Sequence, residues 1–573
     1  MGERETTEVD AGGVPALGDD RLGPHQRADA VEALKATSAA NPLDILVIGG
    51  GVVGCGAALD GAARGLSVGL VEMNDLAAGT SSRSSRLAHG GLRYLEQREF
   101  SLVHEALTER GLLLDRLAPH LVRPVPFLFP VEKTWQRPYV ASGIHLYDML
   151  SRIGAYGGSM PRPKSLSRQQ SKSLAPDLDT DGIAGAVRFH DAQIDDARHT
   201  IAVARTAAAR GAHVVTRTRV TSLLRDGDEV VGVRVHDALD DTDYDIHAKV
   251  VVGAAGVWTD DLIHLADETA PGRVQQSKGV HLVIPRDSIR STTAIIARTP
   301  VSVLFLLPWG RFWLVGTTDT PWSTEDGDMA DPQATEADID YLLEQANRWL
   351  ARPLTRADVV ATYAGLRPLL AAEVEDADDE TTTLSREHAV IRPAPGLVVI
   401  AGGKYTTYRV MAADVVDAAV AEIADEDTSI PESPTADIPL VGADDFATMW
   451  AERGSIARDS GLDTHVVEAL LRRHGDRITD VLELIATDPD LAKPLIEEAN
   501  YLRAEAVLAA THQGALSLDD VLTRRLRVSL DVPDHGEEAA RAAAPLVAGV
   551  LGWSDRRTAD EVAGFDADMA WAG

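Results

Sequence analysis

The sequence predicts an α/β fold with a helical C-terminal region, and three observations predict it. A strand, a glycine turn, a helix and a second strand follow one another between residues 42 and 72, which is the order of a βαβ unit. Further short apolar strands follow discontinuously up to residue 400. Beyond residue 443 the apolar residues recur mostly at helical spacing.

The first elements each carry a local signal. Residues 44–48 form a continuous apolar run that glycines follow, which is typical of a buried parallel strand. Residues 52–64 are rich in Ala and Gly, which favours a helix packed closely on a sheet, and Gly65 is placed to end that helix. Residues 67–72 predict the second strand.

The later elements are expected in this order: a helix over residues 197–210, strands over residues 213–220, 230–236, 250–254, 311–315 and 397–400, and a helix over residues 408–424. An acidic, proline-bearing stretch then indicates a linker. We therefore divide the chain into a flexible N-terminal arm (1–41, with one helix near 26–37), a central α/β region (42–430) and a helical C-terminal domain (431–573).

Composition excludes several classes of protein. Acidic residues outnumber basic ones by 88 to 55, so the net charge is −33, and such a chain repels nucleic acid. The single cysteine, Cys55, excludes an internal disulfide and a multi-cysteine metal site. We expect no metal at the Asp195-Asp196 pair, because no ligand cluster accompanies it and a helix cap explains it better.

The sequence also bears on location. No apolar stretch approaches the roughly 20 residues of a spanning helix, and residues 1–40 lack the apolar core of a signal peptide. We expect a cytoplasmic protein that makes at most peripheral contact with the inner face of the plasma membrane.

The glycine turn indicates a dinucleotide. Gly49-x-Gly51-x-x-Gly54 lies between the first strand and the first helix. Its glycines permit a tight turn, a close approach of pyrophosphate and close helix–strand packing, while the helix N-terminus favours the phosphates. Glu72 ends the second strand, where a carboxylate can accept hydrogen bonds from an adenosine ribose.

A hydroxyl-rich loop follows this unit. Spacing alone does not choose between FAD and NAD, but hydroxyls placed where the bound dinucleotide would extend can bond further phosphate oxygens and polar atoms of a flavin ring. The residues of this loop expected to contact the cofactor are Thr80, Ser81, Ser82, Ser85, His89, Gly90 and Gly91.

Taken together, the motifs resemble one family. They are the turn 49–54, residues 80–94 (TSSRSSRLAHGGLRY), 278–281 (KGVH), 316–319 (GTTD), 363–368 (YAGLRP), 402–409 (GGKYTTYR) and 512–522. In this order they resemble the FAD-dependent, respiratory, non-NAD glycerol-3-phosphate dehydrogenase family over nearly the whole chain. The resemblance implies a Rossmann-like FAD domain of the glutathione-reductase or amine-oxidase type with an inserted α+β substrate domain.

The resemblance also implies an activity. It implies oxidation of sn-glycerol 3-phosphate to dihydroxyacetone phosphate in glycerol and glycerophospholipid catabolism, with electrons passing from reduced FAD to a quinone. The sequence shows no evident attachment motif, so we expect FAD to be held without a covalent link. Gly256, Gly403 and Thr406 lie where small residues or a helix N-terminus would approach the flavin.

The family's substrate pocket, carried onto matching positions, points to Arg93, Tyr94, Arg367, Arg386 and Lys404. A phosphate dianion needs fixed cations, and the guanidinium fork of arginine matches its oxygens. Two routes to deprotonate the substrate alcohol stay open. His281 has a suitable ordinary pKa for a base, and cations such as Arg367 can instead lower the pKa of the alcohol.

Two other functions are compatible with these motifs. One is a glycerol-3-phosphate oxidase that returns electrons to oxygen, and the other is a flavin-fold binding protein without catalysis. The second predicts no convergent group of cations, whereas four candidate cations lie in motif positions. The sequence is compatible with a monomer or an oligomer.

Overall fold

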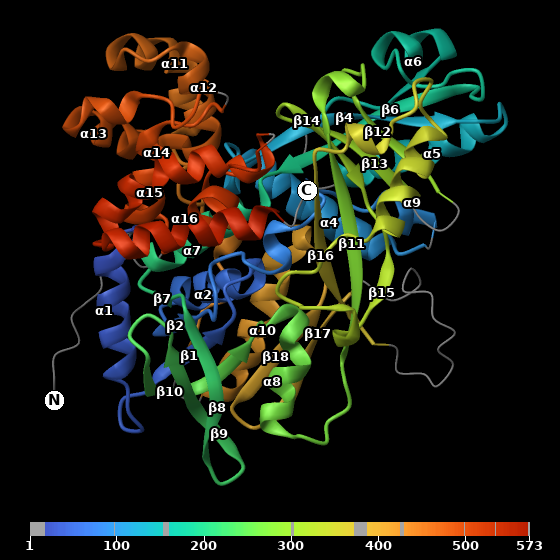
Figure 1. The fold of residues 1–573 in the computed structure, drawn as a ribbon. Helices are drawn as coiled ribbons and strands as arrows, with labels where there is room; N and C mark the ends of the chain where they lie inside the picture. The colour runs from blue at the N-terminus through green and yellow to red at the C-terminus, as the bar shows by residue number, and fades with distance from the viewer. Residues whose placement is uncertain are drawn as a thin grey trace.

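The computed structural model describes residues 18–96, 98–152, 160–299, 303–371, 387–424, 429–497, 499–532 and 534–570. Figure 1 shows three parts: a lower sheet with its helices, an upper right sheet, and a helical C-terminal region at the upper left. Each part has its own apolar core.

The first sheet is built on the predicted βαβ unit. Strand β1 (Leu43–Ile48) runs parallel to β2 (Val68–Val71), with Ile45 opposite Val68. The described strands follow the order β17 (His388–Ala394), β18 (Leu397–Gly402), β10 (Thr242–Gly253), β1, β2 and β7 (His213–Val215), and β8 (Thr218–Asp226) and β9 (Glu229–Asp237) extend from β10.

Helices cover both faces of this sheet. The glycine- and alanine-rich α2 (Val52–Ala63) packs between α7 (Asp196–Ala209) and α10 (Tyr408–Ile423), and the three share one core with β1. The other face carries α1 (Pro24–Lys35) and α8 (Thr259–Ala266).

The second sheet is mixed. Strand β11 (Val274–Pro285) pairs with β16 (Ala361–Leu370), and this register places His281 opposite Tyr363 and Ser277 opposite Arg367. The remaining described strands are β15 (Thr320–Trp322), β14 (Phe312–Gly316), β13 (Val303–Trp309), β12 (Ala294–Arg298), β4 (Val122–Val131), β6 (Gly185–Ile194), β5 (Lys164–Leu166) and β3 (Leu87–Ala88).

Four longer helices flank this second sheet. They are α4 (Phe100–Leu112), α5 (Gln136–Ser151), α6 (Arg168–Leu174) and α9 (Glu336–Asn347). The short helix α3 (Leu92–Glu96) precedes α4. No helix of the described part of the chain is long and apolar enough to cross a membrane.

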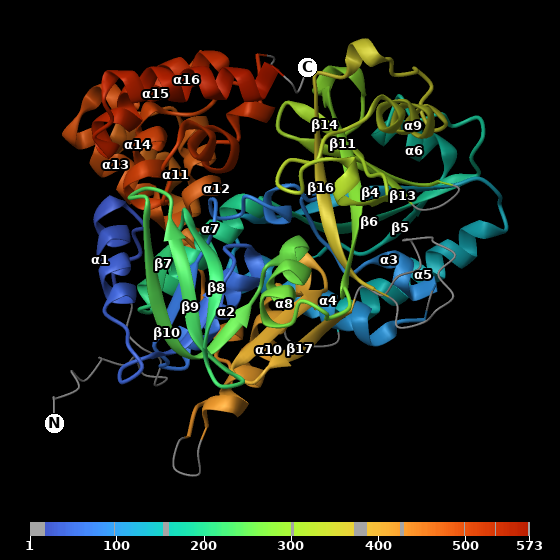
Figure 2. The same cartoon turned by 60° about the horizontal axis from the view of Figure 1, so that its bottom comes forward.

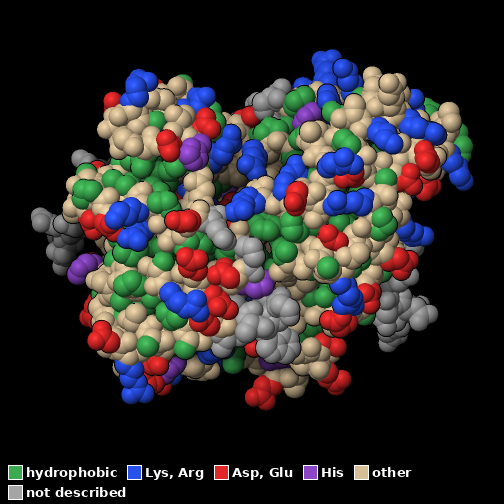
Figure 3. Space-filling model, turned by 45° about the horizontal axis from the view of Figure 1, so that its top comes forward, with side chains coloured by type: hydrophobic (Ala, Val, Ile, Leu, Met, Phe, Trp, Pro, Cys, Tyr) green, Lys and Arg blue, Asp and Glu red, His purple; other side chains and the backbone are tan. Residues whose placement is uncertain are grey.

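The C-terminal region is helical, as expected. Its helices are α11 (Phe446–Ser460), α12 (Thr464–His474), α13 (Ile478–Thr487), α14 (Arg503–His512), α15 (Glu537–Leu551) and α16 (Asp555–Ala570). They lie against α1 and α7 in both ribbon views (Figures 1 and 2). At the surface, a hollow rimmed by Lys and Arg side chains separates them from the second sheet (Figure 3).

Two expectations differ from the structure. The flexible arm does not extend to residue 41, because Ala30, Val31 and Leu34 of α1 are buried in a core that they share with β10. The single strand expected over residues 213–220 is two strands. Arg217 interrupts it with φ of 58° while its guanidinium binds Asp520 of the C-terminal domain at 2.7 Å.

Candidate functional site

The glycine turn has the geometry that a phosphate cradle needs. Gly49 has φ of 114°, and a Cβ there would lie 2.5 Å from the Ala254 carbonyl oxygen. A Cβ on Gly54 would lie 1.9 Å from the Gly49 oxygen, so this glycine lets α2 pack against the turn. Gly49 and Gly51 line a cavity of about 390 Å³ at the start of α2.

Glu72 lies in the wall of the same cavity, as expected for a ribose ligand. Its carboxylate accepts hydrogen bonds from the backbone N–H groups of Gly50 at 2.6 Å and Asn74 at 2.7 Å. Burial raises the pKa of Glu72, and the two N–H groups oppose that effect. Each carboxylate oxygen keeps a second acceptor position. Gly256, with φ of 58°, lines the cavity as well.

The hydroxyl-rich loop joins this cavity to a second one of about 480 Å³. Thr80 and Ser84 line both cavities, and so do Gly403, Lys404 and Tyr405. The two cavities therefore adjoin, and together they offer an extended site for a long cofactor and a small substrate.

The loop hydroxyls have different local partners. Thr80 donates to the Leu366 carbonyl at 2.6 Å, and Ser81 Oγ accepts from the Val52 N–H at 2.9 Å. Ser82 and Gly90, which we predicted to contact the cofactor, line neither of the two cavities. The Ser82 carbonyl faces the C-terminal domain, where it accepts from Arg527. The Gly90 N–H donates to the Tyr147 hydroxyl at 2.7 Å.

His281 lies in the wall of the second cavity, on β11. Its Nε2 is 2.9 Å from Ser85 Oγ, and its ring stacks on Tyr363 with centroids 4.7 Å apart. Burial, together with the cations Arg367 and Arg86, lowers the pKa of His281 to about 3. The imidazole is therefore neutral at pH 7, and one of its ring nitrogens carries a lone pair.

Arg367 projects from β16 into the same cavity. Its Nη2 donates to Thr317 Oγ1 at 3.1 Å and to the Thr318 carbonyl at 3.2 Å, and its Nη1 lies 3.4 Å from Asp319 Oδ1. A Cβ on Gly279 would lie 2.4 Å from Nη2. The residues 317–319 thus hold the guanidinium in a fixed orientation.

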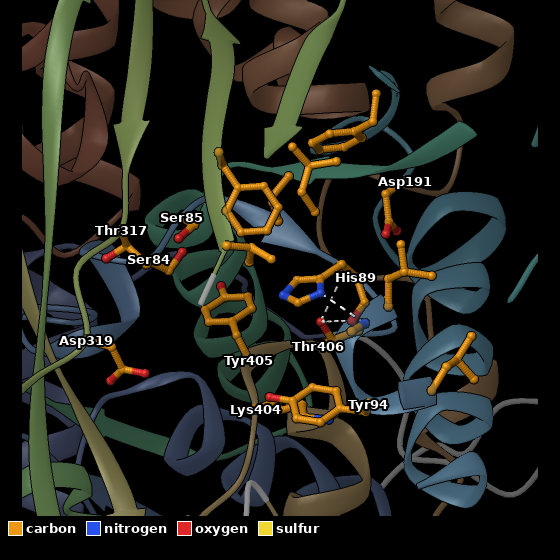
Figure 4. A pocket seen from close by; sticks show the side chains of 18 of the residues that line it. Ser84, Ser85, His89, Tyr94, Asp191, Thr317, Asp319, Lys404, Tyr405 and Thr406 are labelled. Atoms are coloured by element: carbon orange, nitrogen blue, oxygen red, sulfur yellow. Dashed lines mark hydrogen bonds between the residues drawn. The ribbon is translucent and has the colours of Figure 1, made fainter. Parts of the chain in front are cut away.

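Figure 4 shows a third group of side chains in the wall of the cavity, which includes His89, Tyr94, Lys404 and Thr406. Lys404 Nζ lies 3.8 Å from the centre of the Tyr94 ring, within cation–π range. The His89 N–H donates to Thr406 Oγ1 at 3.0 Å, and the Thr406 hydroxyl donates to the His89 carbonyl at 3.2 Å. These bonds tie the loop that carries His89 and Gly91 to the start of α10.

Two of the predicted cations cannot be placed against this site. Arg386 lies outside the described residues, and the side chain of Arg93, in α3, does as well. Conversely, Ser84, Thr317 and Asp319 line the cavity although we did not select them. The GTTD motif was a visible signal for the last two, because a half-buried arginine needs fixed acceptors nearby.

Comparisons with known proteins match two regions of the chain. Residues 44–416 match the family model described as FAD dependent oxidoreductase, and residues 433–558 match the C-terminal domain of alpha-glycerophosphate oxidase. The chain is 52% identical over 547 residues to a glycerol-3-phosphate dehydrogenase of Mycobacterium leprae, covering 95% of this chain and 90% of that one.

More distant relatives agree. The chain is 36% identical to the mitochondrial glycerol-3-phosphate dehydrogenase of Mus musculus, with 91% of this chain and 72% of that protein covered. Among solved structures, it is similar to the glycerol-3-phosphate dehydrogenase of Bacillus halodurans complexed with FAD. The TM-score is 0.77, the identity 28%, and 96% of this chain and 98% of the other are covered.

Proposed function

Because the chain belongs to the FAD-dependent glycerol-3-phosphate dehydrogenase family, we propose that it oxidises sn-glycerol 3-phosphate to dihydroxyacetone phosphate and delivers the electrons to a quinone. The chain is an FAD-dependent enzyme. The observation that carries the proposed chemistry is the pairing of a neutral, buried His281 with a fixed Arg367 on one cavity wall. We also propose the division at residues 42–430 and 431–573.

The described residues fit FAD. The cradle at Gly49 and Gly51 leaves space for a pyrophosphate that side chains would fill, and Glu72 is placed for the ribose. When bound, FAD supplies the hydride acceptor. Gly403, with φ of 86°, precedes the helical turn that leads into α10. The backbone N–H groups at the start of a helix favour negative charge.

The substrate phosphate needs cations in the second cavity. Lys404 and Arg367 lie in its wall, and Arg93 and Arg386 are further candidates from the sequence. Tyr94 supports Lys404 through the face of its ring. This arrangement supports recognition of the dianion, with the C2 hydroxyl turned toward His281.

Two routes serve the alcohol proton. The described residues provide no hydrogen-bond partner for Nδ1 of His281, while Nε2 pairs with Ser85. If Nδ1 carries the ring proton, the Nε2 lone pair, which then accepts from the Ser85 hydroxyl at 2.9 Å, is the acceptor of the substrate proton. Arg367 favours the developing alkoxide electrostatically.

An apolar rim supports a quinone acceptor. Phe100 on α4 and Tyr139 on α5 line the second cavity, yet 46% and 59% of their surfaces are exposed. Trp135 and Met149, at either end of α5, are exposed as well. An apolar rim beside a flavin site suits a lipid-soluble acceptor and peripheral contact with the inner face of the plasma membrane.

The experiment is anaerobic addition of glycerol 3-phosphate to the yellow holoenzyme. We expect the flavin band to bleach, glycerol to bleach it far less, and menadione to restore it. Bleaching by dithionite but not by glycerol 3-phosphate would contradict the proposed substrate. One peroxide per turnover in air, with slow reoxidation by menadione, would instead identify an oxidase. Recovery only in detergent extracts would contradict peripheral contact.

A further inference from the structure

Asp196 forms hydrogen bonds with two loops of the flavin site. This buried residue is the first of α7. Its Oδ2 accepts from the Ser84 N–H at 3.1 Å and from the Ser84 hydroxyl at 2.7 Å. Its backbone carbonyl accepts from the Tyr405 hydroxyl at 2.6 Å. Ser84 and Tyr405 both line the two adjoining cavities.

The other carboxylate oxygen of Asp196 is occupied from the C-terminal domain. Arg527 Nη2 donates to Asp196 Oδ1, and Arg527 Nη1 donates to the Ser82 carbonyl at 3.1 Å. Arg527 has φ of 62°, a conformation that non-glycine residues rarely adopt. Its side chain is only 3% exposed. One guanidinium therefore reaches both the hydroxyl-rich loop and the residue that anchors it.

The pair is costly to break. Both side chains are withdrawn from water, so removing Arg527 leaves the buried Asp196 carboxylate without its ion-pair partner. An unpaired Asp196 would draw water or rearrange, and Ser84 would move with it. Ser85, the next residue, is the hydrogen-bond partner of His281.

The adenosine end of the site has a similar connection. Asp75, three residues after Glu72, binds Arg525 Nη2 at 2.8 Å and Arg524 Nε at 2.5 Å. Both arginines belong to the same C-terminal segment as Arg527, and both are buried. The C-terminal domain thus contacts the supports of the cofactor site at both ends, although none of its described residues lines either cavity.

We propose that Arg527 and Asp196 are positioning residues through which the C-terminal domain holds residues 80–86 and 402–406 in the arrangement that flavin reduction requires. This gives the helical domain a task in catalysis although it does not touch the reacting atoms. The inference concerns the FAD site itself and does not depend on which acceptor takes the electrons.

The test compares Arg527→Met and Arg527→Lys with a matched control. Arg473 forms a similar ion pair with the buried Glu505, at 2.6 and 2.8 Å, within the C-terminal domain. Arg473→Met therefore removes a comparable charge from the same domain without touching the flavin loops. Four quantities are measured: melting temperature, the FAD dissociation constant of the apoprotein, flavin midpoint potential, and the anaerobic reduction rate per bound flavin.

We expect Arg527→Met to slow reduction per bound flavin by roughly ten- to a hundredfold, the effect of a small misplacement of reacting groups. We expect it to weaken FAD binding and shift the midpoint potential as well. Arg527→Lys keeps the charge but loses the fork, so its effects should be intermediate. Arg473→Met should lower the melting temperature and leave reduction rate and potential unchanged.

A purely structural role would give a different pattern. In that case Arg527→Met and Arg473→Met would both lower the melting temperature, and Arg527→Met would keep the wild-type reduction rate per flavin, FAD affinity and midpoint potential. This result would overturn the proposal. If Arg527→Met fails to fold, the Lys variant decides by the same criteria. FAD affinity and potential need no glycerol 3-phosphate, so they test the inference even if the proposed substrate proves wrong.

Discussion

Replacing Arg367 should separate phosphate binding from the rest of the reaction. The guanidinium lies within hydrogen-bond range of Thr317, Thr318 and Asp319. A lysine ammonium is a single point of charge and cannot meet these acceptors and a phosphate in the same geometry. Losing one charge-assisted contact of about 1.5–3 kcal/mol corresponds to roughly ten- to a hundredfold in affinity. Arg367→Ala should therefore lower kcat/KM by at least that factor, and Arg367→Lys by less.

The assay is steady-state reduction of an artificial acceptor with glycerol 3-phosphate and with glycerol, after flavin content is measured. Arg367→Ala should keep its FAD, because the glycine turn and Glu72 lie in the other cavity. Arg290→Ala is the control, since that arginine is 74% exposed in an ion pair with Asp177. Unchanged kcat/KM in a flavin-loaded Ala variant would refute the assignment. Equal proportional loss on both substrates would place Arg367 at the alcohol instead.

Three further results are expected. Because burial and nearby cations lower the pKa of His281 from 6.5 to about 3, the unfolded chain binds a proton that the folded chain does not. Stability should therefore decrease as the pH falls from about 6.5 toward 3, and denaturant titrations of His281→Gln should show a shallower decrease. Gly316→Ala places a Cβ 2.4 Å from His281 Cδ2. The overpacking should lower the free energy of unfolding by about 1–3 kcal/mol, and the substitution should slow flavin reduction. A wild-type reduction rate would contradict this contact. Acid precipitation should release the yellow chromophore into the supernatant, whereas colour retained in the pellet would contradict non-covalent binding.

The parts of the site that are local in sequence could be predicted, and those built by long-range pairing could not. The turn at Gly49 and the acid at Glu72 lie within one βαβ unit, so their spacing predicts that they lie close together, and both line one cavity. The contact of Asp319 with Arg367 depends instead on the pairing of β11 with β16, which sets Arg367 opposite Ser277, a hydrogen-bond partner of Asp319. The hydrophobic periodicity of the sequence does not predict which residues of two distant strands pair with each other.

The same limit applies to features that distant parts of the chain determine. Ser82 belongs to the predicted loop, but its carbonyl turns to Arg527, 445 residues further along the chain. The N-terminal helix is short and weakly apolar, and it is held by a core that includes Val251 of β10. Burial of Leu34 depends on that distant strand rather than on the sequence around it.

The distance between Ser82 and Arg527 along the chain also sets an order of events during biosynthesis. Their hydrogen bond spans 445 residues. At roughly 5–20 residues per second, a ribosome needs on the order of 20–90 s to cover that distance. The glycine turn and the hydroxyl-rich loop therefore emerge long before the arginine that contacts the loop, and this contact can form only after residue 527 has been translated.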